Sequence, residues 1–190
     1  RGIRILVAGR TLAFSAAHLV AQVRWRSVDR RQIIHGAERR LQPLPLSHAQ
    51  ERQWFLWKLA PQSTAYHMSG ALRLSGALDA AAMHAAFEDI AARHESLRTV
   101  FLAGADGTAE QLISPSWAPL LNLVDLRHLA ASEREARAAE EAQRLYTAPF
   151  DLTQGPLLRV ALIRLSDTSH LLVVVMHHII SDSASMQVLL

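Results

Sequence analysis

Two apolar segments separated by a short polar turn constrain the fold of this chain most. Residues 157–165 and 170–176 are rich in aliphatic side chains, and residues 166–169 between them are polar. The second segment contains the run Leu-Leu-Val-Val-Val-Met, whose β-branched residues favour a strand. The pattern predicts two adjacent strands, of which the second is buried.

Three segments carry signals of amphipathic helices. Residues 47–59 begin with the S-x-x-Q pattern of a capping box and end shortly before a proline. Asp79 is expected to cap a second helix, in which apolar residues recur at helical spacing. Residues 132–135 repeat the capping-box pattern, which predicts a third helix reaching Tyr146.

Shorter segments complete an α/β pattern. Residues 66–74 alternate well enough for a strand, and residues 100–102 and 110–113 flank a Gly-Ala-Asp-Gly hairpin signal. Residues 120–126 form a further strand candidate. We therefore expect an α/β domain of the α+β type, with a mixed or antiparallel sheet and packed helices.

Charge divides the chain unevenly. Residues 1–40 hold nine arginines and two acidic residues, whereas the rest of the chain is mildly acidic. We expect residues 1–43 to be a linker or the tail of a preceding domain, and residues 44–190 to form one unit, truncated from something longer. The basic residues do not interleave with aromatic ones as in a nucleic-acid groove, so no nucleic-acid partner is expected.

A histidine pair follows the predicted buried strand directly. His177 and His178 stand at its end, and Asp182 follows four residues after His178. Successive side chains of a strand point to opposite faces, so one imidazole should face a cavity and the other should pack inside. An imidazole titrates near pH ~6.5, so the ring at the cavity can move a proton at neutral pH. A purely structural histidine at a strand end is the alternative interpretation.

Several other kinds of site lack their sequence signals. The chain has no cysteine and no HExxH or HxH cluster, so no metal site is expected. It also lacks GxSxG, a P-loop and GxGxxG, which argues against a serine hydrolase and a nucleotide site. The missing cysteines fit a reducing, cytoplasmic compartment, and no apolar run approaches the ~20 residues of a membrane span.

Three segments, taken in order, resemble the first core motifs of nonribosomal peptide synthetase condensation domains. They are residues 47–54 (S-H-A-Q-E-R-Q-W), 93–101 (R-H-E-S-L-R-T-V-F) and 176–182 (M-H-H-I-I-S-D). Residues 74–79 and 150–159 resemble the family as well. The resemblance covers about residues 44–190.

The resemblance implies a chloramphenicol-acetyltransferase-like fold, of which this chain holds the N-terminal lobe. The implied reaction is amide formation, in which a carrier-bound aminoacyl thioester attacks a carrier-bound acyl or peptidyl thioester. The implied partners are the upstream and downstream peptidyl carrier domains and the missing C-terminal lobe, with no membrane involved. The substrates ride on the 4′-phosphopantetheine of the carriers, and no cofactor is bound directly. We expect the isolated chain to be inactive.

The family pattern also assigns roles to the motif residues. It implies that His178 acts as general base or positions the amine, while His177 and Asp182 are mainly structural. Asp182 is expected to pair with Arg98 or Arg93.

The chain departs from the family directly after the motif aspartate. The family usually has a glycine and then an aromatic residue there, and this chain has Ser183 and Ala184. Serine adopts a positive φ less readily than glycine, so we hypothesise impaired activity or altered acceptor access. A noncatalytic carrier-docking module, a standalone acyltransferase and an epimerisation-type relative are the alternatives.

Overall fold

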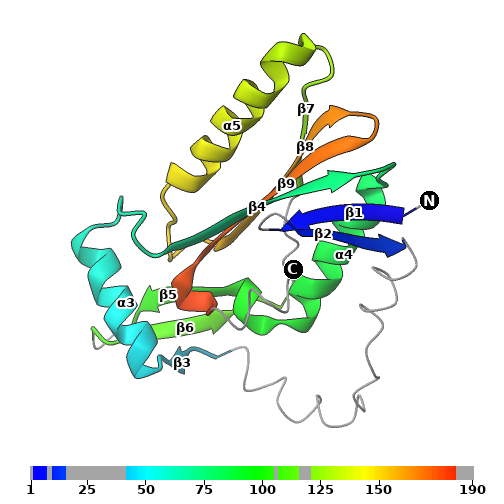
Figure 1. The fold of residues 1–190 in the computed structure, drawn as a ribbon. Coiled ribbons are helices and arrows are strands. Elements are labelled where there is room, and N and C mark those ends of the chain that lie inside the picture. Colours follow the sequence, from blue (N-terminus) through cyan, green and yellow to red (C-terminus); the bar gives the residue numbers. More distant parts are fainter. Residues whose placement is uncertain (1, 8–9, 16–41, 105–106, 116–120, 183–190) are drawn as a thin grey trace, which may run out of the picture.

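The chain forms a large mixed sheet with helices on both sides and a second, smaller sheet beside it (Figure 1). The computed structural model describes residues 2–7, 10–15, 42–104, 107–115 and 121–182. The large sheet has six strands in the order β2-β1-β4-β9-β8-β7. Their bounds are Gly2–Val7 (β1), Arg10–Ser15 (β2), His67–Ser75 (β4), Leu121–Asp125 (β7), Leu158–Ser166 (β8) and Ser169–His177 (β9).

The predicted pair of apolar strands is confirmed as the centre of this sheet. β8 and β9 pair antiparallel, and β9 also pairs antiparallel with β4 along its whole length. Val173 and Val175 of β9 are fully buried, which is the reason for the β-branched run in the sequence. β7 pairs parallel with β8, so the sheet is mixed as expected.

The smaller sheet has the strand order β3-β6-β5 and contains the predicted hairpin. Its strands are Leu44–Pro45 (β3), Thr99–Ala103 (β5) and Ala109–Ile113 (β6). Phe101 of β5 is fully buried, and its backbone N–H donates to Leu152 O at 2.8 Å. This bond attaches the smaller sheet to the segment that leads into β8.

The first two predicted helices begin at the caps that the sequence indicates. In α3 (His48–Leu59), Ser47 and Gln50 form the reciprocal capping box. In α4 (Ala80–Arg93), the Asp79 carboxylate accepts from the backbone N–H groups of Ala81 and Ala82. A short 3₁₀ helix, η2 (Glu95–Arg98), then connects α4 to β5.

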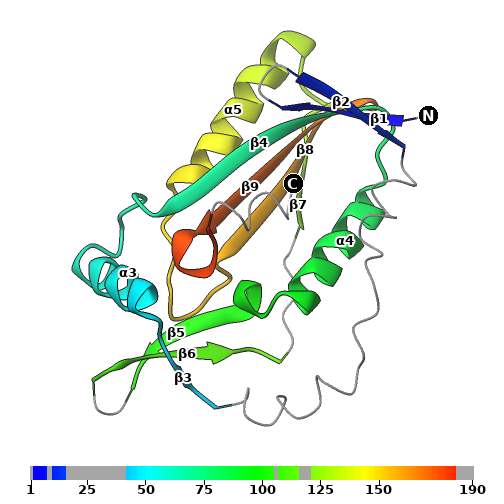
Figure 2. The ribbon, with the colours of Figure 1, turned by 60° about the horizontal axis from the view of Figure 1, so that its bottom comes forward.

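The third helix, α5 (Ala131–Thr147), begins earlier than predicted. Its N-cap is Ala130 and not Ser132, and the Glu133 carboxylate accepts from the Ala130 backbone N–H at 3.3 Å. An alanine side chain has no acceptor, so only the glutamate half of a capping box is present. α5 connects β7 to its parallel neighbour β8 and packs on β4, β8 and β9, while α4 lies on the opposite side of the sheet (Figures 1 and 2).

Part of the expected linker pairs with the sheet. β1 and β2 form a hairpin, and β1 pairs antiparallel with β4 from Arg4↔Ser75 to Leu6↔Arg73. Residues 16–41 of the expected linker lie outside the described residues. The domain boundary between residues 43 and 44 stays a prediction.

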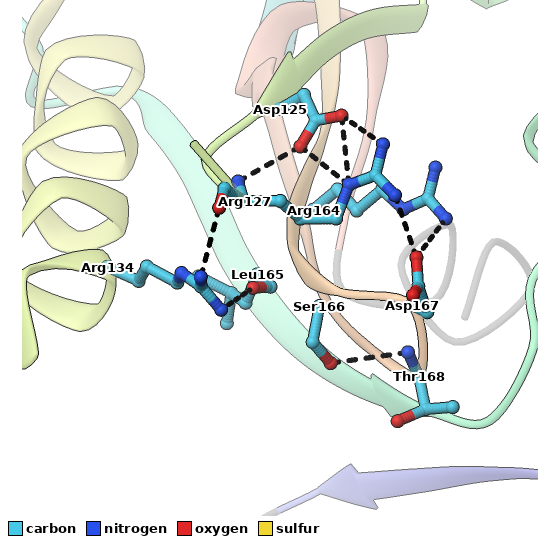
Figure 3. Close-up of polar contacts among 8 residues, drawn as sticks. All are labelled: Asp125, Arg127, Arg134, Arg164, Leu165, Ser166, Asp167 and Thr168. Carbon is cyan, nitrogen blue, oxygen red and sulfur yellow. Dashed lines mark hydrogen bonds and ion pairs between the residues drawn. The ribbon is translucent and has the colours of Figure 1, made fainter. Parts of the chain in front are cut away.

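A network of ion pairs ties the end of β7 to the turn between β8 and β9 (Figure 3). Arg127 binds the Asp125 carboxylate through Nε and a terminal nitrogen, and its other terminal nitrogen contacts Asp167 at 2.7 Å. Arg164 contacts the same Asp167 oxygen at 2.8 Å. The hydrogen bond from Arg127 holds the pKa of Asp125 well below its usual range. Solvent screens these exposed charges, so the network orders the turn more than it stabilises the fold.

Candidate active site

The histidine motif lies where the central strand of the large sheet ends. β9 ends at His177, and the chain then turns into a second 3₁₀ helix, η3 (His178–Ile180). The His177 N–H donates to Leu157 O at 3.0 Å, and the His178 N–H donates to Tyr66 O at 2.8 Å. The two histidines are thus fixed through their backbones, one to the start of β8 and the other to the start of β4.

His177 is the buried member of the pair, at 3% exposure. Its Nδ1 accepts the Ile179 backbone N–H at 3.1 Å, so Nδ1 carries no proton. Burial, and after it the nearby His67 and His178, lower the pKa of His177 to about 4. A ring that is neutral at pH 7 and already accepts a backbone bond acts as a cap for η3.

His178 is exposed, and its Nδ1 donates a hydrogen bond where that of His177 accepts one. Its Nδ1 lies 2.5 Å from Ser181 O. A carbonyl oxygen only accepts, so Nδ1 must carry the proton. In the neutral ring the lone pair is then on Nε2, which is the form a general base needs.

A strand that continued through both histidines would point their side chains to opposite faces. The strand in fact ends at His177, and the turn into η3 separates the two environments. His177 packs inside, as expected of one ring, and His178 is exposed. That the second ring faces a cavity stays a prediction. The catalytic assignment of His178 stays a prediction.

Two further side chains hold the turn that carries His178. The buried Ser181 hydroxyl lies 3.3 Å from His177 O and 3.4 Å from the Met68 sulfur. Gln50 uses its Oε1 to accept the Ser47 N–H at 2.9 Å and directs its Nε2 to Ile179 O at 3.5 Å. From the sequence, Gln50 was expected only to cap its helix. Its position in the first of the three family-like segments could have indicated a contact with the site.

The other predicted site residues are the motif aspartate, its two candidate arginine partners and the two residues after the aspartate. Asp182 is exposed and directly follows the η3 turn. Arg98 donates to Ser114 O and contacts Glu95 at 3.4 Å, and Arg93 is the last residue of α4. The pairing of Asp182 with either arginine stays a prediction. Ser183 and Ala184 lie outside the described residues.

A cavity of about 410 Å³, whose lining includes neither histidine, lies between η2, β5, β6 and the segment before β8. Arg98, Val100 and Leu157 are among its lining residues, and His178 is not. The cavity lining contains no His, Asp, Glu or Lys that could serve as a base. Within the described ranges, no cluster of His, Asp or Glu is arranged to hold a metal ion, and no helix has the length and hydropathy to cross a bilayer.

The chain is similar to known proteins along most of its length. A family model of the condensation domain matches residues 41–190. The chain is 47% identical over 147 residues to one of the linear gramicidin synthase proteins of Brevibacillus parabrevis, covering 77% of this chain and 3% of that protein. It is 43% identical over 151 residues to phosphinothricin tripeptide synthetase PhsC of Streptomyces viridochromogenes, covering 77% of this chain and 13% of that protein.

Solved structures show the same fold. The starter condensation domain of rhizomide synthetase RzmA matches with a TM-score of 0.69 at 28% identity, over 75% of this chain and 34% of that one. The first condensation domain of the calcium-dependent antibiotic synthetase, in complex with a substrate analogue, matches with a TM-score of 0.68 at 28% identity, over 76% of this chain and 35% of that one. The chain thus spans about a third of these domains. The chain belongs to the condensation domain family.

Proposed function

We propose that this chain is the histidine-bearing lobe of a condensation domain that forms amide bonds in nonribosomal peptide synthesis. The amine of one carrier-bound aminoacyl thioester attacks the carbonyl carbon of another carrier-bound thioester. A C–N bond forms, a C–S bond breaks, and the carrier thiol leaves. The partners are the two carrier domains and a C-terminal lobe, in the cytoplasm.

The observation that carries the proposal is the state of the His178 ring. With Nδ1 donating to Ser181 O, Nε2 is left to take the proton that the attacking amine loses. That proton can then pass to the departing thiolate. Tethering both substrates on carriers makes the encounter effectively intramolecular, which supplies a further share of the rate. The chain itself needs no cofactor in this scheme, since the phosphopantetheine belongs to the carriers.

Replacement of His178 tests the proposal in a complete condensation domain that includes residues 1–190, with both carriers loaded. We expect His178→Ala to slow amide formation by about 10² to 10⁴. His48, which is fully exposed on α3, provides the matched control, and His48→Ala should leave the rate unchanged. Near-wild-type product formation by a folded His178→Ala variant would contradict the catalytic role.

A noncatalytic carrier-docking module is the second candidate, favoured by Ser183 and Ala184 in place of the family's glycine and aromatic residue. Such a module binds loaded carriers without turning them over. Carrier binding with no product from the wild-type domain selects this candidate, and product formation rejects it.

A further inference from the structure

A base at Nε2 of His178 requires that the ring proton stay on Nδ1. The acceptor for that proton is the carbonyl oxygen of Ser181, at 2.5 Å. Ser181 therefore influences which nitrogen of His178 is free, although its side chain does not contact the ring in any described bond.

Ser181 is held in place by hydrogen bonds of its backbone N–H and its hydroxyl. The residue is extended, with φ −152° and ψ 158°, and is 8% exposed. Its N–H donates to His178 O at 3.4 Å. Its hydroxyl has one proton to share between His177 O, at 3.3 Å, and the Met68 sulfur, at 3.4 Å. The carbonyl oxygen is much the stronger acceptor of the two, so it fixes the hydroxyl.

The anchor of that hydroxyl is itself rigid. His177 is buried at the end of β9 and is bonded to β8 through its N–H and to η3 through its ring. The contacts therefore form a continuous series. The central strand holds the Ser181 hydroxyl, the hydroxyl fixes the Ser181 residue, and the carbonyl of that residue accepts the ring proton of His178.

We propose that Ser181 is a positioning residue for the reaction: its hydroxyl orients the peptide whose carbonyl keeps the His178 proton on Nδ1. This inference rests on the proposed base role of His178. Loss of the hydroxyl lets the carbonyl turn away, and the proton then divides between Nδ1 and Nε2. A smaller fraction of the rings is then competent as a base, while the substrates bind as before.

The first test compares Ser181 variants in the complete, carrier-loaded domain. Ser181→Ala should lower kcat by about 3- to 10-fold, the loss expected for one hydrogen bond, with KM unchanged. Ser181→Thr keeps the hydroxyl and should restore most of the rate. Ser181→Cys keeps the volume with a weaker donor, gives an intermediate kcat, and replaces the alanine variant if that variant does not fold. Ser166→Ala removes a serine hydroxyl at the end of β8, in the turn that leads into β9, and should change nothing.

The second test repeats Ser181→Ala in a His178→Ala background. If Ser181 acts through His178, the second substitution adds no further loss of kcat. A loss of equal size in both backgrounds means that Ser181 is merely structural and overturns the inference. If His178→Ala itself has no effect, the proposed function fails first, so the two failures are distinguishable.

Nitrogen chemical shifts of the His178 ring give a third measurement. In the wild-type domain with the His178 ring neutral, Nδ1 should have the shift of a protonated nitrogen and Nε2 that of an unprotonated one. Ser181→Ala should bring the two shifts together as the tautomers mix, and Ser181→Thr should separate them again. Unchanged shifts in Ser181→Ala overturn the inference.

Discussion

Two adjacent imidazoles have opposite hydrogen-bonding roles in this chain because the backbone turns between them. His177 accepts a backbone N–H through Nδ1, whereas His178 donates from Nδ1 to a backbone carbonyl. Each ring is therefore held in one tautomer by a neighbour no more than three residues away. The proposed base and the histidine beside it are distinguished by local geometry and not by residue type.

For this single residue, a consequence is that protonation of His177 should make the free energy of unfolding depend on pH. Its pKa is near 6.5 in the unfolded chain and about 4 in the folded one, so the unfolded state binds more protons between these values. Stability should therefore fall as the pH drops from 6.5 to 4, by about 2 kcal/mol between pH 7 and pH 5. Urea unfolding of the complete domain at both values measures this difference.

The matched variant for that measurement is His177→Gln. Its amide oxygen can still accept the Ile179 N–H but does not titrate, so the loss between pH 7 and pH 5 should shrink by that amount. His48→Gln, at an exposed position, should keep the wild-type difference. An equal loss in His177→Gln and wild type argues against burial of His177 as the cause.

At the scale of elements, α3 is joined to the motif through its own cap. Gln50 caps the helix with Oε1 and reaches Ile179 O of η3 with Nε2, while Trp57 near the other end donates to Phe150 O at 3.0 Å. The start of α3 is therefore linked to the turn that follows β9, and Figure 2 shows α3 beside that turn.

Two substitutions separate the contacts of Gln50. Gln50→Ala loses both contacts and should lower the free energy of unfolding by about 1 kcal/mol. Gln50→Glu keeps the acceptor for the Ser47 N–H and loses only the donor to Ile179 O, so the helix cap survives. We expect Gln50→Glu to be more stable than Gln50→Ala. Both variants lose the contact with Ile179 O, so both should lower kcat to a similar extent. Equal stability and full activity in both variants would exclude this link.

The elements also show which features the sequence could predict. The caps at Ser47 and Asp79 were predicted correctly because each side chain bonds within its own first turn. The start of α5 was predicted two residues late because Ser132-x-x-Glu135 has the capping pattern, yet the helix begins at Ala131 with Glu133 as its partner. The tautomers of the histidines depend on bonds formed across the η3 turn, so no pattern of residue types reveals them.

For the whole molecule, the aligned part of the chain covers about a third of the condensation-domain structures it matches. We expect residues 1–190 alone to form no amide from two loaded carriers, because His178 is exposed without a second lobe to bring the substrates to it. Single-turnover assays of the isolated chain and of the complete domain make the comparison. Product from the isolated chain at a rate near that of the complete domain would show that one lobe suffices.

Long-range features of the sheet were harder to predict than its centre. The central hairpin was evident because a buried strand needs a continuous apolar run. The pairing of β1 with β4 joins segments about 70 residues apart, and the arginines near β1 favoured a linker instead. The sheet edge therefore had to be seen in the structure.

The position of the motif at the end of the central strand has a consequence for dynamics. The amide hydrogens of His177 and His178 are bonded to the strand segments on both sides, so they should exchange with solvent only when the sheet itself opens. We therefore expect the turn that carries His178, the proposed base, to open together with the sheet and not on its own. If the turn stays folded whenever the lobe is folded, activity must be regulated through the access of substrates to His178 and not through local unfolding of the turn.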